Sequence, residues 1–251
     1  TTLMSLALVA GALLAQAGVA QPPVSVEFHF ESLCKQCQIH VAAIQDIIIH
    51  GGAELSEEEA GISQYLNLSI DYYGSIGPDE TCESAANGTE HGPDMCVTDR
   101  YHLCARELAP SANVWVRFVH CMWMNIDVLK CGGNGHCPTR SEFDRALSVV
   151  FPMCARLTGI EDMQAVDECA RGDRGHALQA ASYARTAARA HYGFAPVFVQ
   201  GQHVDKADAI WRKTPDQLRW GKMVLAAACK SLGETAKSVR ACDDSLINAS
   251  A

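Results

Sequence analysis

Two short segments of the chain alternate between hydrophobic and polar positions, which predicts two β-strands. Residues 24–30 (VSVEFHF) alternate and are rich in β-branched and aromatic side chains, and residues 66–72 (LNLSIDY) repeat the pattern. Between them, the densely apolar residues 39–49 precede Gly51-Gly52. An apolar run of this length that stops at glycine predicts a helix buried on most of its faces.

The middle of the chain is predicted to be helical from about residue 96 to residue 191. Breaks are expected at Pro110, at the glycine-rich residues 131–138, at Pro152 and at residues 172–175, because glycine and proline interrupt helices. The hydrophobic pattern between these breaks therefore predicts several helices rather than one.

The last part of the chain returns to strand and then to helix. Residues 196–200 and 203–204 predict a hairpin, and residues 214–217 (TPDQ) have the residue order of a helix N-terminus, with Gly233 at the predicted C-terminus. An isolated hairpin is only marginally stable in water. The sequence therefore predicts one α/β domain, residues 21–251, of order β-α-β … β-β-α with a large helical insertion at about 96–191.

The composition of the chain indicates its partners and the compartment in which it folds. The chain has 251 residues, a net charge of -9 and twelve cysteines. The negative charge argues against nucleic acid as a partner, and the cysteine content favours an oxidising compartment. Residues 1–20 are uncharged and mostly apolar, which predicts a signal peptide rather than a membrane anchor, and no stable membrane insertion after its removal. Asn67, Asn87 and Asn248 begin N-x-[ST] glycosylation sequons.

The sharpest chemical signal is the C-x-x-C formed by Cys34 and Cys37, between the first strand and the first helix. A helix N-terminus favours the thiolate, so Cys34 is the candidate nucleophile, and Cys37, one turn later, is the candidate resolving thiol. Lys35 is expected to add a small cationic contribution. A fixed structural disulfide is one alternative. A zinc site with Cys131, His136 and Cys137 is another, although the intervals match no usual zinc spacing, and no metal is expected.

Pro196, just before the third strand, is the second candidate feature. In thiol oxidoreductases of this element order a cis-proline faces the dithiol, and Ala195 would then present its backbone to a substrate strand. The alternative is an ordinary trans proline that opens an edge strand.

Apart from Cys34 and Cys37, the cysteines form an even set of ten, which fits a structural disulfide framework. Short loops favour Cys131 with Cys137 and Cys229 with Cys242, and the remaining connectivity stays open. The ten candidates are Cys82, Cys96, Cys104, Cys121, Cys131, Cys137, Cys154, Cys169, Cys229 and Cys242.

Taken together, these segments resemble the gamma-interferon-inducible lysosomal thiol reductases. The resemblance runs from about residue 24 to residue 242. Its elements are the strand with the C-x-x-C, the segment LNLSIDYYG, His91-Gly92 with Cys96 and Cys104, the segment CARGDRG from Cys169, the segment APVFVQG from Ala195, and the terminal pair Cys229 and Cys242. The chain departs from the family signature at Thr89, Glu90 and Asp99, where the family has Cys, Gln and Asn. Cys82 is expected to replace the missing half-cystine.

The resemblance implies a thioredoxin-like, disulfide-rich fold and an enzyme that reduces disulfides in protein substrates. It implies no bound cofactor, an external small thiol as reductant, and a location in the secretory pathway, lysosomal or secreted. It leaves His91 as a general base or, more commonly, as a residue that organises a turn. A thiol with a pKa of about 8.5 is ionised in roughly one molecule in three thousand at pH 5, so activity there requires a strongly depressed pKa at Cys34. The rival interpretations are an oxidase or isomerase, and a non-catalytic secreted protein with a fixed C-x-x-C disulfide.

Overall fold

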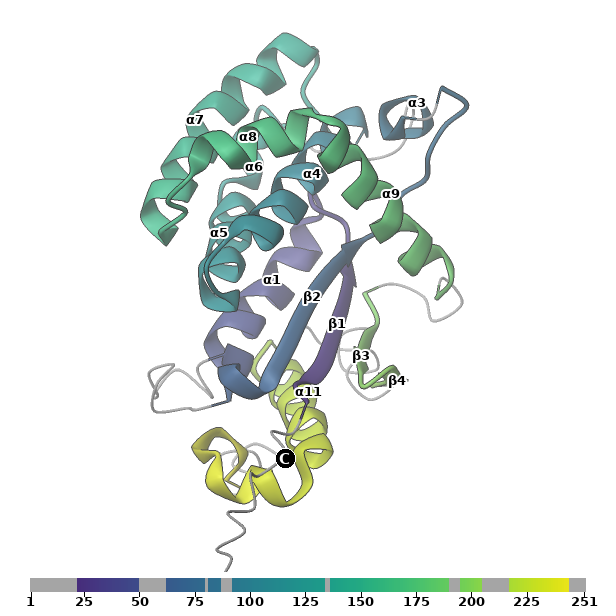
Figure 1. Cartoon of the computed structure of the whole chain (residues 1–251). Helices are drawn as coiled ribbons and strands as arrows, with labels where there is room; N and C mark the ends of the chain where they lie inside the picture. Colours follow the sequence, from purple (N-terminus) through teal and green to yellow (C-terminus); the bar gives the residue numbers. More distant parts are fainter. Residues whose placement is uncertain are drawn as a thin grey trace, which may run out of the picture.

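The computed structural model of the chain describes residues 22–49, 62–79, 81–86, 92–133, 136–189, 195–204 and 217–243. At its centre lies a four-stranded sheet with strand order β2-β1-β3-β4 (Figure 1). The strands are β1 (Val24–Phe30), β2 (Leu66–Tyr72), β3 (Val197–Val199) and β4 (Gln202–His203). β1 pairs in parallel with β2 and antiparallel with β3, and β3 pairs antiparallel with β4. The first and last parts of the chain therefore form one sheet.

Two helices cover one face of this sheet. They are α1 (Lys35–Ala43), which continues as a π-helical turn (Ile44–Ile49), and α11 (Gln217–Leu232). The apolar positions of β1 face them: the rings of Phe28 and Trp220 lie 5.8 Å apart, and those of Phe30 and His40 lie 5.4 Å apart. The alternation seen in the sequence thus separates an apolar face of β1 from a polar one.

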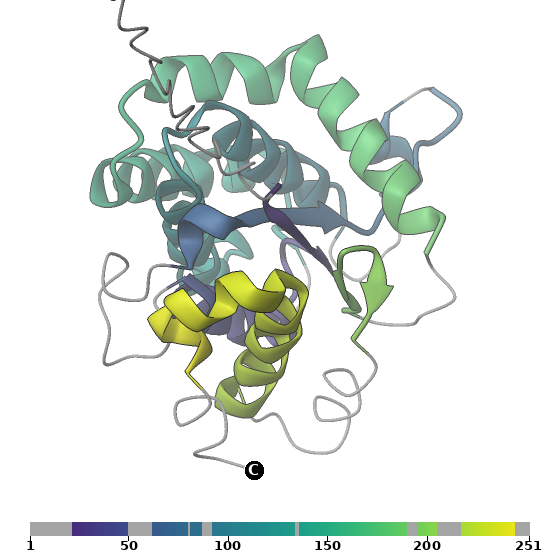
Figure 2. The same cartoon turned by 60° about the horizontal axis from the view of Figure 1, so that its bottom comes forward.

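The helical insertion lies between β2 and β3 in sequence. Its last helix lies on the other side of the sheet from α11 (Figure 2), whereas its helix of residues 112–124 packs against α1. Its helices are α3 (Cys82–Ala86), α4 (Gly92–Leu108), α5 (Ala112–Met124), α6 (Ile126–Leu129), α7 (Arg140–Thr158), α8 (Met163–Arg171) and α9 (Asp173–Ala187). α4 is almost entirely buried because α5, α8 and α9 pack around it. α9 also binds the sheet, where the Thr186 hydroxyl donates to the Tyr72 carbonyl over 2.9 Å.

The predicted break at Pro152 is wrong, because Pro152 lies inside α7. Proline removes one helical hydrogen bond and crowds the preceding turn. Here the residues around it are anchored: Phe143, Leu147 and Val150 are buried, and a disulfide at Cys154 ties the helix to α5. Tertiary packing therefore overrides the local cost of the proline.

The described residues also contain short 3₁₀ helices: η2 (Ser63–Tyr65) before β2, and η4 (Gly233–Ser238) and η5 (Arg240–Cys242) after α11. Gly233 has a positive φ of 58° at the end of α11, as expected for a glycine that terminates a helix. The residues predicted to begin that helix, 214–216, lie outside the described part of the chain, as do the predicted signal peptide and His91.

This arrangement is a disulfide-rich, thioredoxin-like α/β fold with a helical insertion. Within the described ranges, no helix combines the length and the apolar character needed to cross a membrane. The sheet places one end of β1, and the turn that follows it, directly before the C-x-x-C.

Candidate active site

The C-x-x-C occupies the first turn of α1. Cys34 is the N-cap residue, with extended backbone angles of φ -87° and ψ 116°, and its N–H donates to the Glu31 carbonyl over 3.2 Å. The N–H of Cys37 then donates to the carbonyl of Cys34 over 3.1 Å. The sulfur of Cys34 is thus carried at the helix terminus where backbone N–H groups favour negative charge, and Cys37 lies one turn inside.

The two sulfurs differ in access and in chemistry. Both are thiols rather than members of a disulfide. Cys34 is 6% exposed, whereas Cys37 is completely buried. Burial, and then the hydrogen bond with Cys34, hold the pKa of Cys37 well above its ordinary value. Cys37 therefore keeps its proton and can donate it toward the Cys34 sulfur, which stabilises negative charge on Cys34.

Two lysines lie beside this turn, and their surroundings differ. Lys35 is exposed and forms an ion pair of 2.5 Å with Asp127 of α6. The carboxylate therefore offsets the positive charge that Lys35 was expected to place near Cys34. Lys130, just after α6, is 3% exposed, and its ammonium donates to the carbonyl of Leu33 over 3.4 Å. Sequence reasoning missed Lys130, because nothing local marks a lysine whose burial depends on long-range packing.

A buried polar group lies close to the loop that leads to the dithiol. Asp99 of α4 accepts a hydrogen bond of 2.6 Å from the Tyr183 hydroxyl, and its carboxyl is also close to Ser32. Burial raises the pKa of Asp99 to about 7 despite these two hydroxyls. The Ser32 hydroxyl also donates to the Met95 carbonyl over 3.2 Å, so α4 supports the segment just before Cys34.

The interior next to Cys37 is aromatic. The hydroxyl of Tyr72 is 2.9 Å from Nδ1 of His102, and the ring of Trp123 packs against both Phe30 and His102. Tyr72 is within electrostatic range of Cys37. All of these side chains are buried, and α5, which carries Trp123, packs against α1, which carries Cys37.

The prediction of a cis peptide bond before Pro196 is wrong. The described residues contain no cis peptide bond, so the Ala195–Pro196 bond is trans. Without a contact that selects the cis form, an X–Pro bond favours trans by about 0.5–1 kcal/mol. The chain enters β3 through Ala195 in the left-handed region, with φ 50°. The Pro196 carbonyl accepts a hydrogen bond of 3.2 Å from the N–H of His29, near the end of β1 that leads to Cys34.

The other ten cysteines form five disulfides. Both pairs expected from short loops are present, Cys131–Cys137 and Cys229–Cys242. Cys82 is bonded to Cys96, which is the replacement expected for the half-cystine missing at position 89. Two long-range bonds, Cys104–Cys169 and Cys121–Cys154, tie α4 to α8 and α5 to α7.

The zinc and glycosylation candidates from the sequence have different outcomes. The zinc alternative loses Cys131 and Cys137 to their disulfide, and no group of three His, Cys, Asp or Glu side chains in the described ranges could hold a metal ion. Asn67 is exposed on β2, whereas Asn87 and Asn248 lie outside the described residues.

Residues 25–134, which contain the dithiol and its supporting helices, match the sequence model of the family described as gamma interferon inducible lysosomal thiol reductase (GILT). This segment of the chain is similar to the GILT family. No curated protein matches the chain. The GILT match includes both cysteines of the C-x-x-C and ends before β3, so the role of Pro196 depends on the structure rather than on the family match.

Proposed function

We propose that this protein is a thiol–disulfide oxidoreductase that reduces disulfide bonds in protein substrates. The observation that carries the proposal is the asymmetry of the dithiol. Cys34 is the more accessible sulfur at a helix N-terminus, and Cys37 is a buried thiol with a raised pKa. A nucleophile needs access and thiolate character, whereas a resolving thiol must stay protonated until a mixed disulfide has formed.

The reaction proceeds in two exchanges. The Cys34 thiolate attacks one sulfur of the substrate disulfide and forms a mixed disulfide, and the other substrate sulfur leaves as a thiolate that takes a proton from solvent. Cys37 then loses its proton and attacks the Cys34 sulfur, which releases the second substrate thiol. The substrate has gained two electrons and two protons, and Cys34 and Cys37 have become a disulfide.

A small external thiol completes the cycle. Two equivalents of it reduce the Cys34–Cys37 disulfide and are themselves oxidised to a disulfide, so no bound cofactor is required. The five structural disulfides favour folding in the secretory pathway, with a lysosomal or secreted final location.

Insulin reduction with a small thiol as electron donor tests the proposal. The wild type should catalyse reduction, Cys34→Ser should abolish it, and Cys37→Ser should accumulate a mixed disulfide with substrate that mass spectrometry can detect. The double variant Cys131→Ser/Cys137→Ser is the matched control, because it removes two sulfurs outside the dithiol and should keep activity. Equal and negligible turnover by the wild type and Cys34→Ser would support the non-catalytic interpretation.

The direction of the chemistry is measured separately. Equilibrating the dithiol with glutathione gives its reduction potential. A potential below that of the glutathione pool supports the reductase, and a distinctly more oxidising one supports an oxidase or isomerase.

A further inference from the structure

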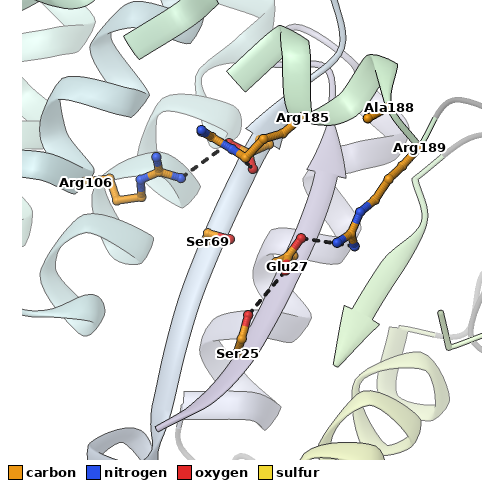
Figure 3. Close-up of a pocket in the computed structure, with 8 residues that line it drawn as sticks. Ser25, Glu27, Ser69, Arg106, Arg185, Ala188 and Arg189 are labelled. Atoms are coloured by element: carbon orange, nitrogen blue, oxygen red, sulfur yellow. Dashed lines mark hydrogen bonds and ion pairs between the residues drawn. The ribbon is translucent and has the colours of Figure 1, made fainter. Parts of the chain in front are cut away.

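A pocket of about 510 Å³ lies on the polar face of the sheet, opposite α1 and α11 (Figure 3). Its floor is formed by side chains of β1 and β2, including Glu27, Ser69 and Asp71, and its wall by Arg106 of α4 and Arg185 of α9. The dithiol is on α1, so this pocket is separate from the candidate active site. Its size is within the range of small-molecule sites.

Asp71 is held in place by hydrogen bonds from neighbouring side chains. It is 2% exposed and accepts two hydrogen bonds from Arg185, of 2.8 and 2.7 Å, and one of 3.1 Å from Ser182. Burial alone would raise the pKa of Asp71, but Arg185 and Arg106 together hold it below its ordinary value. Asp71 is therefore a carboxylate, and it balances one of the two guanidinium groups.

Arg106 supplies the unbalanced charge. Its Nη1 donates to the Ile70 carbonyl over 2.9 Å and lies 3.7 Å from the Asp71 carboxylate, which Arg185 already engages with two bonds. Two guanidinium groups around one carboxylate leave one net positive charge at this end of the pocket. A guanidinium that is held by a backbone carbonyl keeps further N–H donors for a ligand.

The opposite end of the pocket does not cancel this charge. Arg189 pairs with Glu27 over 3.1 Å, and its guanidinium lies 4.0 Å from the centre of the Phe198 ring. That pair is neutral as a unit. Burial lowers the pKa of the neighbouring His29 to about 4, so it is neutral as well. The lining as a whole therefore carries an excess of one positive charge.

A polar donor completes the arrangement. Ser69 points from β2 into the pocket between the two ends, as Figure 3 shows. Its hydroxyl makes no hydrogen bond to any residue that the structure describes, so it is available to a ligand. Arg106, Arg185 and Ser69 thus present donors to one region with a surplus positive charge.

We propose that this pocket binds a small molecule through an oxyanion, a carboxylate or a phosphate, held by Arg106, Arg185 and Ser69. Guanidinium groups match the planar geometry of carboxylates and the oxygens of phosphates. The volume exceeds that of a bare ion, so the oxyanion belongs to a larger small molecule. The site extends beyond the proposed reductase activity and does not depend on it.

The test uses the whole chain with its disulfides intact. Inorganic phosphate and acetate are titrated separately against chloride at equal ionic strength, and binding is followed by NMR of arginine Nε–H groups and by calorimetry. At least one of the two anions should bind saturably. Phosphate binding without acetate binding would indicate a phosphate ligand, and the reverse would indicate a carboxylate.

Three variants locate the site. Arg106→Gln should weaken binding about tenfold and Ser69→Ala about threefold, since each removes a donor to a charged group. Arg117→Gln on α5 removes the same charge from an exposed position outside the pocket and should bind as the wild type does. Cys34→Ser should also bind normally, which separates this proposal from the reductase.

Absence of saturable binding by both anions would overturn the proposal. Equal affinities in Ser69→Ala, Arg106→Gln and Arg117→Gln would overturn it as well. Ser69→Ala keeps the test decisive if Arg106→Gln does not fold, because the Ser69 hydroxyl bonds to none of the described residues.

Discussion

The hydroxyl of Tyr183 in α9 donates a 2.6 Å hydrogen bond to the buried carboxyl of Asp99 in α4. The same hydroxyl lies 3.0 Å from the sulfur of Cys82, which is bonded to Cys96 of α4. One tyrosine therefore joins a buried acid, a structural disulfide and two helices behind the segment that precedes the dithiol. Asp99 is one of the positions at which the chain departs from the signature of the family that it resembles.

Asp99→Asn should stabilise the protein at neutral and alkaline pH but not at acid pH. Burial raises the pKa of Asp99 to about 7 in the folded protein, so the carboxyl contributes stability below pH 4 and loses it as the pH rises through 7. The difference in unfolding free energy should grow from near zero at pH 4 to at most about 4 kcal/mol above pH 7. Urea unfolding at several pH values measures it, and a constant difference would contradict the prediction.

His29→Phe should have the opposite pH dependence. Burial lowers the pKa of His29 to about 4 from its ordinary 6.5, so its contribution to stability is present above pH 6.5 and is lost as the pH falls toward 4. The advantage of phenylalanine should therefore increase over that interval, by about 3 kcal/mol at most. Urea unfolding of the variant and the wild type at several pH values measures the difference, and a difference that does not change with pH would contradict the prediction.

Lys130→Met should slow the alkylation of Cys34 by iodoacetamide about tenfold at pH 6. The buried ammonium is held at the Leu33 carbonyl, one residue before Cys34, where its charge favours the thiolate. Lys35→Met removes the same charge from an exposed, paired lysine and should change the rate little. Similar rates in both variants would show that Lys130 has only a structural role.

Removing the Cys104–Cys169 bond should cost more stability than removing Cys131–Cys137. The first closes a separation of 65 residues and the second a separation of 6. On the chain-entropy model the costs are about 4 and about 2 kcal/mol. Thermal unfolding of the two double alanine variants compares them. A larger loss from the short loop would contradict the entropic explanation.

Local signals in the sequence predicted those parts of the molecule that local physics determines. Alternation located β1 and β2, and the C-x-x-C between a strand and a helix located the dithiol. Pairings between distant cysteines, such as Cys121 with Cys154, could not be predicted, because they depend on how α5 and α7 pack.

The burial of individual charged residues also could not be predicted from the sequence. Lys130 and Asp99 are charged residues of ordinary appearance, and only the packing of α4 and α6 shows that they lie within the core. The continuation of α7 through Pro152 likewise depends on tertiary contacts. The pocket lined by Arg106, Arg185 and Arg189 is formed by four elements that are distant along the chain, β1, β2, α4 and α9.

The Cys104–Cys169 bond spans most of the helical insertion, so it affects what proteolysis of this region releases. Any single cleavage between those two cysteines, for example at the turn around Gly159, leaves two pieces that remain covalently joined. After cleavage at Gly159 the two pieces would stay together until a reductant opened that bond. Cleavage products from this region should therefore separate on a reducing gel and migrate together on a non-reducing one.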